Sequence, residues 1–449
     1  MTGHPSQPLT SHLKILVLYS SMNKHIILFG AGKSASILIT YLLEQCAVYN
    51  WRLTVADIDI NLAQSKTSQS LYAEVKQMQV EDAEQRAALV KEGDLIISML
   101  PPALHFLVAS DCLLYSKNLL TASYLDEKIK SLAPAIKNKG LLFLCEMGLD
   151  PGIDHMSAMR LIDRVELLGG EISSFKSHCG GLTAPESDDN PWHYKISWNP
   201  ANIVRAGASG ARFMEDRLVK EIDYKQLFNN CKSVTVEGID HLVYYPNRNS
   251  LPYMALYNLQ NAATFMRTTL RHTDYCKAWN CLVNAGLTDD SSPANYTGLT
   301  FKKWSAALTP YINSINKIQF GYLGLFDEQV IPGHLKTSAA ILQFLLENKL
   351  MMQPTDNDMI VMLHEVEYYR EEVLYKTNSR LILKGAGNIN TAMAKTVGLP
   401  LGIAAGLILK NELLLTGLHI PVIPEIYNPV LDELHNEGIT FIECDSVVK

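Results

Sequence analysis

A glycine-rich turn directly after an apolar run constrains the fold of this chain more than any other feature. Residues 25–29 (HIILF) are typical of a buried strand, and residues 30–35 (GAGKSA) break that run and open a helical pattern. In this context the G-x-G-x-x-A spacing indicates a dinucleotide-binding domain. Gly30 permits a tight turn, Gly32 lets a pyrophosphate approach the backbone, and the small Ala35 allows close packing of helix and strand. The helix N-terminus then faces the phosphates.

Strand and helix patterns alternate from residue 24 to residue 148, which predicts a parallel sheet with helices on both faces. Further strand candidates in this region are WRLTVADID, GDLIISMLPP, NLLTASY and GLLFLCEMG. We therefore expect residues 24–148 to form an α/β, Rossmann-type, doubly wound domain, preceded by an extension over residues 1–23.

The pattern changes after this region. Alternating strands such as EISSFKSHCGGLTAP, YKISWNP and DMIVMLHEVEYYR predict a mixed α/β substrate or dimerisation domain over residues 149–252 and 353–389. A helical insertion is expected over residues 253–352, with NLQNAATFMRTTLRH among its helices. Residues 390–449, which contain a long apolar helix, are expected to complete the first domain.

Composition excludes several classes of protein. The net charge is −7 with acids and bases interspersed, so no basic block indicates a nucleic-acid partner. The apolar runs are shorter than the roughly 18 residues of a membrane span, so no membrane association is expected. The 8 cysteines form no C-x-x-C and no histidines have zinc spacing, so we expect no metal and reduced thiols in the cytoplasm.

The end of the second strand candidate bears on the choice of cofactor. Asp57 stands there in the run ADIDIN, which has no arginine. A carboxylate at this point binds the ribose hydroxyls of NAD and repels the 2′-phosphate of NADP, so the residue chemistry favours NAD. Lys33 or Lys66 could still reach a phosphate. Ser98, at the end of LIIS, is expected near the cofactor for the same topological reason.

An acid-rich bend follows the fifth strand candidate, in FLCEMGLDPGIDHMSAM. It holds Glu146, Asp150, Asp154 and His155 around a Pro-Gly turn. Asp154 precedes an apolar helical stripe and is therefore expected to be the helix N-cap. Glu146 is expected to be structural. Asp150, at a strand end, is the remaining candidate for substrate binding or proton transfer.

Several longer motifs resemble those of saccharopine reductase, in the saccharopine dehydrogenase family. The matching stretches, which extend from about residue 24 to the C-terminus, are FGAGKSA, IISMLP, TASY, EMGLDPGIDH, SHCGGLTAPESDDNPWHYKISW, YYPNRNS, TTLR and TAMAKTVGLPLGIA. The resemblance implies a cytoplasmic homodimer of lysine metabolism, in the α-aminoadipate pathway. It implies reversible, NADP-dependent oxidation of the secondary amine of saccharopine to L-glutamate and L-2-aminoadipate 6-semialdehyde. NAD stays open because of Asp57.

The resemblance also assigns residues. The implied substrate contacts are Tyr124, Asp150, Arg248, Thr269, Leu270 and Arg271, of which Tyr124 and Asp150 are the catalytic candidates. The implied cofactor contacts are Gly30, Gly32, Lys33, Ser34, Ala35, Asp57, Ile58, Ser98, Ser123 and Leu149.

Individual side chains suggest roles within this assignment. Arg248, in a Pro- and Asn-containing loop, could hold a carboxylate through two parallel hydrogen bonds. Arg271 is expected on the same helical face as Arg267, four positions earlier. Lys195 is read either as a carboxylate anchor or proton carrier, or as an outward lysine on a strand. Cys179 either lines the site or only packs.

Two alternatives stay open. One is a related imine reductase that forms carboxynorspermidine or homospermidine, although several ammonium groups on the substrate would favour acids over Arg248 and Arg271. The other is a non-catalytic dinucleotide-sensing protein.

Overall fold

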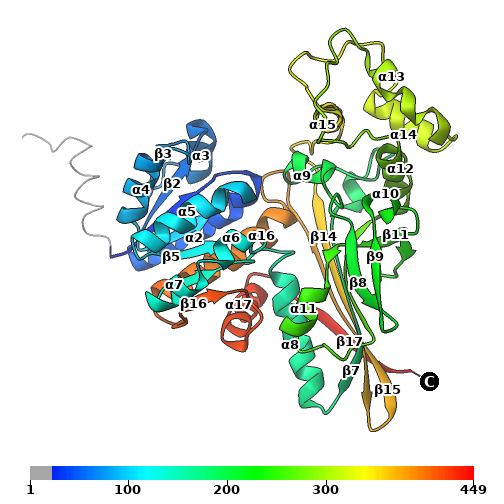
Figure 1. Cartoon of the computed structure of the whole chain (residues 1–449). Coiled ribbons are helices and arrows are strands. Elements are labelled where there is room, and N and C mark those ends of the chain that lie inside the picture. The colour runs from blue at the N-terminus through cyan, green and yellow to red at the C-terminus, as the bar shows by residue number, and fades with distance from the viewer. Residues whose placement is uncertain (1–22, 449) are drawn as a thin grey trace, which may run out of the picture. The chain divides into compact units, whose positions relative to one another are not determined.

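A computed structural model describes residues 23–448, which divide into two compact units (Figure 1). The first unit contains the chain up to Met156 together with Ala394–Leu434. The second contains Ser157–Met393 together with the residues from His435 onward. Each unit is therefore built from two separate stretches of sequence.

The first unit contains a seven-stranded parallel sheet, which confirms the doubly wound fold class. Its strands, in spatial order, are β16 (Gly417–His419), β6 (Leu142–Leu144), β5 (Asn118–Thr121), β4 (Leu95–Ser98), β1 (His25–Phe29), β2 (Arg52–Asp57) and β3 (Ala73–Gln77). The chain runs outward from β1 to β3 and then returns to the other side of β1. Ligands bind such sheets at the carboxyl ends of the strands beside this reversal, here β1 and β4.

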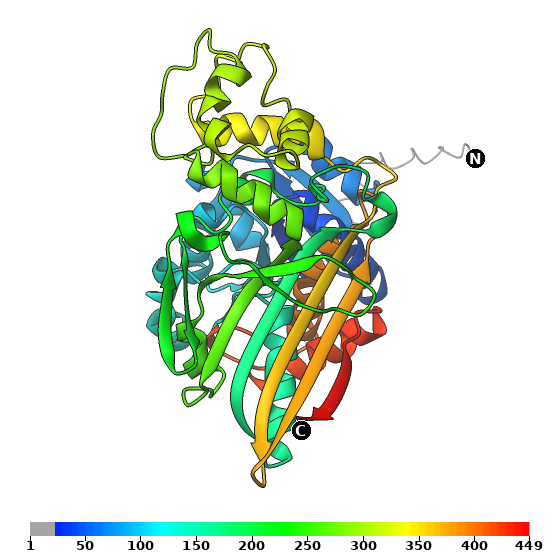
Figure 2. The same cartoon turned by 90° about the vertical axis from the view of Figure 1, so that its right-hand side faces the viewer.

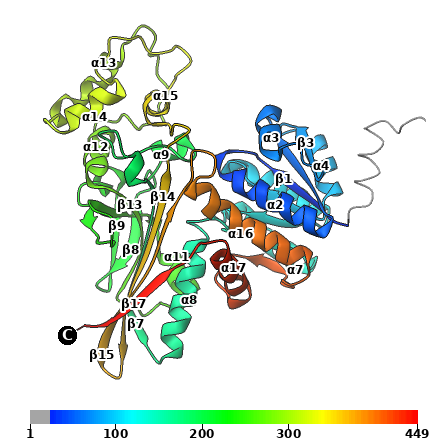
Figure 3. The same cartoon turned by 180° about the vertical axis from the view of Figure 1, so that it is seen from behind.

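Helices cover this sheet and shield its apolar strands. They are η1 (Lys33–Ala35), α2 (Ser36–Tyr49), α3 (Ile60–Thr67), α4 (Ala83–Glu92), η2 (Pro102–Leu104), α5 (His105–Leu114), α6 (Glu127–Lys130), α7 (Ala133–Asn138), α16 (Ala392–Leu409) and α17 (Pro424–Asn436). Helices α2 and α16 lie side by side (Figure 3). A Cβ atom on Gly398 would lie 2.9 Å from the backbone nitrogen of Leu38, so glycine is needed for this approach.

Helix α16 corrects one expectation from composition. It has 18 residues with a mean hydropathy of 1.7, and by length and composition alone it could cross a membrane. The prediction that no apolar run reaches this length is therefore wrong for α16. However, 72% of the helix is buried inside the protein, which explains why its sequence is apolar on most sides.

The second unit contains a ten-stranded mixed sheet, whose long strands face the viewer in Figure 2. Its main path is β10 (Lys232–Ser233), β11 (Leu242–Pro246), β13 (Thr264–His272), β7 (Glu171–Thr183), β14 (Asp358–Arg370), β15 (Val373–Lys384) and β17 (Ile442–Val447). The strands β8 (Ala211–Glu215), β9 (Leu218–Ile222) and β12 (Arg248–Asn249) lie off this path. Strands β13 and β7 are parallel, whereas β14 is antiparallel to both of its neighbours.

Helices accompany this sheet, and α13 to α15 gather at one end of it (Figure 2). They are α8 (Ile153–Leu167), which begins in the first unit, η3 (Pro185–Ser187), α9 (Pro200–Val204), α10 (Tyr224–Leu227), α11 (Leu251–Leu256), α12 (Thr273–Asn284), α13 (Phe301–Trp304), η4 (Ser305–Tyr311), α14 (Asn316–Leu323) and α15 (Ser338–Leu350). Their core is aromatic. The rings of Trp192 and Trp279 meet edge to face with centroids 6.4 Å apart, and both side chains are buried.

The boundaries differ from the expected domains in three places. Residues 264–272 form the central strand β13 rather than a helix, because pairing with β7 and β11 and three β-branched threonines favour the extended backbone. Residues 194–198 form no strand, only an isolated bridge from Ile196 to Met351. Finally, β16 joins the first unit but β17 pairs with β15 in the second. The expected extension over residues 1–23 lies almost entirely outside the described residues.

Candidate functional site

The glycine loop after β1 has the geometry that a dinucleotide requires. Gly30 has φ of +98°, and a Cβ atom there would lie 2.8 Å from the carbonyl oxygen of Met99. A Cβ atom on Gly32 would meet nothing within 4 Å among the described residues, so the backbone there is open to a ligand. Lys33 and Ser34 follow in η1, and Ala35 is buried. These residues fit a dinucleotide pyrophosphate.

Asp57, at the end of β2, organises this loop. Its Oδ2 accepts a 2.6 Å hydrogen bond from the backbone N–H of Ala31, and its Oδ1 accepts one of 2.8 Å from Asp59. Both carboxylate oxygens therefore bind backbone amides of the protein. The next side chain, Ile58, is 63% exposed. Asp57 is thus weaker evidence for NAD than its position in the sequence suggests, because its charge already has partners in the loop.

Lys66 brings a positive charge to the same loop. Its Nζ donates a 2.5 Å hydrogen bond to the carbonyl oxygen of Gly32. Burial lowers the pKa of Lys66 to about 8, an effect that Asp57 opposes and Lys33 increases. A cation beside the glycine loop is suited to a phosphate group.

His105 connects two of the expected cofactor residues and was missed from the sequence. Its Nδ1 lies 2.8 Å from Oγ of Ser98, at the end of β4, and its Nε2 lies 2.7 Å from Oγ of Ser123, just after β5. Burial lowers the pKa of His105 to about 4, so the ring is neutral and donates to one serine while accepting from the other. The sequence does contain a signal for this contact, because His105 begins α5 only seven residues after Ser98, the last residue of β4.

Tyr124 and Asp150 form the pair that could act on a substrate. The Tyr124 hydroxyl donates a 2.8 Å hydrogen bond to Oδ1 of Asp150. Tyr124 follows β5, and Asp150 lies between β6 and α8, beside the buried Leu149. Both belong to loops at the carboxyl edge of the sheet, which also carries the glycine loop, Ser98 and Ser123.

The other acids of the bend are structural. Glu146 is buried, and its carboxylate lies 2.8 Å from Nε2 of His155 and accepts a 3.0 Å bond from the backbone of Leu125. Asp154 is not the N-cap, because α8 already begins at Ile153. Its Oδ1 instead accepts a 2.6 Å bond from the N–H of Gly152, which braces the turn.

The second unit provides a buried cation at Arg271. The side chain is 5% exposed, its Nη1 donates to the carbonyl oxygen of Leu270 at 2.8 Å, and its guanidinium faces the rings of Tyr194 and Tyr275 at 5.4 and 5.9 Å. Within the described chain, Nε has no hydrogen-bond partner. A buried guanidinium with an unmatched donor is suited to a carboxylate ligand. Neither tyrosine was anticipated from the sequence.

The remaining substrate candidates differ in accessibility. Alternate residues of a strand point to one face, so Arg267, Thr269 and Arg271 lie on the same face of β13. Arg267 and Arg271 were expected to share a face, which is correct, but they do so on a strand and not on a helix. Leu270 points to the opposite face and is fully buried in the core, which leaves only its backbone available to a ligand. Arg248, on β12, is exposed.

Two further candidates have structural partners. Lys195 Nζ donates to Asp189 at 2.9 Å and to Asp356 at 2.7 Å, and its side chain is 7% exposed. These two ion pairs favour a structural role for Lys195 over a role as a proton carrier. Cys179 is buried in β7, where its neighbour across the pair with β13 is Thr269. The candidates therefore form two groups, one in each unit.

Both parts of the chain match models of one family. Residues 26–144 match the saccharopine dehydrogenase NADP binding domain, and residues 148–439 match the saccharopine dehydrogenase C-terminal domain. The chain belongs to the saccharopine dehydrogenase family. The first match supports the NADP that the resemblance implied.

Relatives of this family cover most of the chain. Saccharopine dehydrogenase (NADP(+), L-glutamate-forming) of Schizosaccharomyces pombe is 30% identical, over 93% of this chain and 98% of that protein. A solved structure of the apo L-Glu-forming saccharopine dehydrogenase from Saccharomyces cerevisiae has a TM-score of 0.83 at 28% identity. It covers 94% of this chain and 100% of that one.

Longer relatives also match. The mitochondrial alpha-aminoadipic semialdehyde synthase of Mus musculus is 32% identical over 96% of this chain, and the alpha-aminoadipic semialdehyde synthase of Arabidopsis thaliana is 33% identical over 82%. The chain spans only 49% and 38% of the length of these two proteins.

Proposed function

We propose that this chain is an NADP-dependent saccharopine dehydrogenase of the L-glutamate-forming type. Saccharopine, NADP⁺ and water would give L-glutamate, L-2-aminoadipate 6-semialdehyde, NADPH and a proton. The observation that carries the proposal is Arg271, a buried guanidinium with an unmatched donor, in a chain whose two parts match the two domains of this family. Such a cation is suited to a substrate that carries several carboxylates.

The residues divide the work as follows. Bound NADP⁺ would supply the acceptor for the hydride of the lysine-derived ε-carbon, which becomes the aldehyde carbon of the semialdehyde while the nitrogen leaves with L-glutamate. Asp150 takes up the proton that hydrolysis releases, and the Tyr124 hydroxyl holds the Asp150 carboxylate in place through its 2.8 Å hydrogen bond. Arg271 and Arg248 bind substrate carboxylates, and His105 fixes the two serines at the cofactor edge of the sheet.

Reductases that form carboxynorspermidine or homospermidine are less compatible with this site. Their polyamine products carry several ammonium groups, which a buried arginine would repel. A non-catalytic dinucleotide sensor would have no use for the hydrogen-bonded Tyr124–Asp150 pair beside the glycine-loop edge. Both alternatives therefore rank below the saccharopine reaction.

A rate assay on the purified chain tests the proposal. We expect NADPH formation, followed by its absorbance, when saccharopine and NADP⁺ are supplied together, and slower turnover with NAD⁺. Equimolar L-glutamate and semialdehyde should accumulate. Turnover of a polyamine, or no turnover of saccharopine with either cofactor, would reject it.

A cytoplasmic homodimer is part of the same proposal, by resemblance to the family. Sedimentation of the purified chain at twice its 50.1 kDa mass would support the dimer. Fluorescence of the tagged chain in its own cells would test the location.

A further inference from the structure

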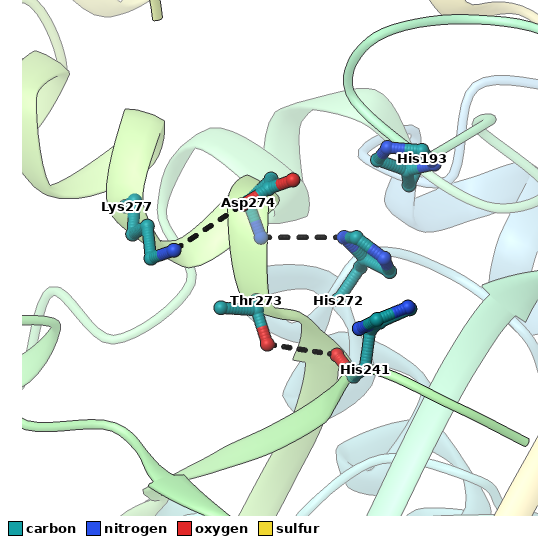
Figure 4. A pocket seen from close by; sticks show the side chains of 6 residues that line it. All are labelled: His193, His241, His272, Thr273, Asp274 and Lys277. Carbon is teal, nitrogen blue, oxygen red and sulfur yellow. Dashed lines mark hydrogen bonds and ion pairs between the residues drawn. The ribbon is translucent and has the colours of Figure 1, made fainter. Parts of the chain in front are cut away.

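A pocket in the second unit gathers three histidines from segments that are far apart in the sequence. It has a volume of about 270 Å³ and is lined by His193, His241, His272, Thr273, Asp274 and Lys277 (Figure 4). His193 comes from the loop after η3, His241 directly precedes β11, and His272 ends β13 where α12 begins. The proposed reaction uses none of these side chains.

Three of them have the arrangement of metal ligands. His193, His272 and Asp274 each offer one ligand atom, and these atoms all lie within 4.8 Å of one another. The rings of His193 and His272 are 3.9 Å apart between centroids, and the ring of His241 lies 5.5 Å from that of His272. All three candidate ligands are partly buried, so an ion there would lose much of its water to protein ligands.

Hydrogen bonds hold both imidazole rings in place. Nδ1 of His193 lies 2.8 Å from Oδ2 of Asp188, so Nδ1–H donates to the carboxylate and Nε2 keeps its lone pair. Nδ1 of His272 accepts a 3.2 Å bond from the backbone N–H of Asp274, and an ion would bind this lone pair in place of the N–H. A carboxylate that holds the second nitrogen of a histidine is the usual support of a metal ligand.

The charges also favour a cation. Asp188 hydrogen-bonds His193, Asp274 lines the pocket, and the lysine that lines it, Lys277, has its ammonium 3.4 Å from Asp274 on a side chain that is 67% exposed. An exposed lysine can turn towards solvent when an ion binds. Two or three imidazoles and one carboxylate suit Zn²⁺ and similar ions, whereas Mg²⁺ and Ca²⁺ prefer oxygen ligands only.

We propose that His193, His272 and Asp274 bind one divalent transition-metal ion of the Zn²⁺ class. His241 lines the same pocket with its ring 5.5 Å from that of His272, and water would fill the remaining positions around the ion. The expectation of no metal rested on sequence spacing, which could not detect ligands that are 79 positions apart, from residue 193 to residue 272.

The ligands are neighbours in sequence of the residues that hold Arg271. His193 precedes Tyr194, His272 follows Arg271, and Asp274 precedes Tyr275. The rings of Tyr194 and Tyr275 flank the Arg271 guanidinium. An ion would therefore tie together the two backbone segments that position this arginine, residues 193–194 and 271–275. This second part of the inference rests on the proposed function, whereas the metal site does not.

Metal binding to the full chain, stripped of ions and without substrate, tests the site. We expect one Co²⁺ per chain with visible d–d absorption, displaced by Zn²⁺, and a Zn²⁺ dissociation constant below about 10 μM by calorimetry. H193Q and H272Q should each weaken Zn²⁺ at least tenfold. H334Q, which replaces an exposed histidine outside the pocket, should bind like the parent chain.

The outcomes separate the two parts of the inference. No saturable binding to the parent chain, or unchanged affinity in both histidine variants, would overturn the metal site, and the parent measurement stands even if a variant fails to fold. With saccharopine turnover established, removal of the ion should raise KM for saccharopine at least threefold while kcat changes little. An unchanged KM would overturn the positioning of Arg271 alone.

Discussion

The Tyr124 hydroxyl donates a 2.8 Å hydrogen bond to Oδ1 of Asp150, and the two residues follow the neighbouring strands β5 and β6. If Asp150 moves the proton, Asp150→Asn should lower kcat by about 100-fold or more, the usual contribution of a positioned acid or base. The Kd of NADP⁺ should be unchanged, because the glycine loop is intact. Steady-state kinetics and cofactor fluorescence measure the two quantities.

Tyr124→Phe provides the companion test. It should lower kcat by a smaller factor, because the carboxylate stays but loses its hydrogen bond. Tyr115→Phe, at the end of α5, removes a phenol of the same unit whose ring contacts Lys91 and should leave kcat unchanged. Wild-type kcat in Asp150→Asn would exclude Asp150 as the proton carrier.

Arg271 should control the affinity for saccharopine. Arg271→Gln removes charge-assisted hydrogen bonds to a carboxylate, so KM should rise by roughly 10- to 100-fold, or about 1.4–2.7 kcal/mol. Arg271→Lys should rescue little, because an ammonium cannot reproduce the planar fork. Arg205→Gln is the matched control, since Arg205 pairs with Asp290 on the surface of the second unit and is 61% exposed. A normal KM in Arg271→Gln would remove Arg271 from the substrate site.

Lys66 should favour NADP over NAD. We expect Lys66→Gln to raise the Kd of NADP⁺ by about tenfold, or about 1.4 kcal/mol, and that of NAD⁺ by less. The pKa of Lys66 is lowered to about 8, so most of the ammonium is present at pH 7 and most of it is lost by pH 9. NADP⁺ affinity should therefore fall between these pH values in the parent chain. The control is Lys76→Gln, at a half-exposed surface ion pair, which should keep the fall in NADP⁺ affinity with rising pH. If Lys66→Gln showed the same fall in affinity, Lys66 would not be the group that binds the phosphate.

His105 should make the protein less stable in acid. Its pKa is about 4 in the folded state and 6.5 in the unfolded chain, so between these values only the unfolded state binds the proton. Stability is therefore lost as the pH falls below about 6.5, by about 2 kcal/mol at pH 5. His105→Asn should show a smaller drop in melting temperature between pH 7 and pH 5 than the parent chain. If the melting temperatures of the variant and the parent chain fell equally, His105 would not be the source of the acid sensitivity.

The sequence predicted the first unit well because its signals are local. The G-x-G-x-x-A turn, the strand ends at Asp57 and Ser98, and the Tyr124 and Asp150 loops all follow apolar strands. Parallel topology brings such strand ends to one edge without further information. Strand β3 (AEVKQ) was missed because it is an edge strand with few apolar residues.

The structure of the second unit could not be predicted from local sequence patterns in the same way. Residues 264–272 pair with two strands that are distant in sequence, and these non-local contacts decided between strand and helix. The tyrosines around Arg271 and the histidine pocket likewise depend on segments brought together by the sheet. Short-range patterns carry no signal for such contacts.

The order of the segments also bears on biosynthesis. The first unit needs α16 and β16, which leave the ribosome only after the whole of Ser157–Met393 has been made. Until then, the face of α2 that Gly398 and Gly402 later cover remains open around Leu38 and Tyr41. The fragment that ends at residue 156 lacks Ala394–Leu434, so limited proteolysis or truncation there should yield an aggregating piece rather than an independent nucleotide-binding module.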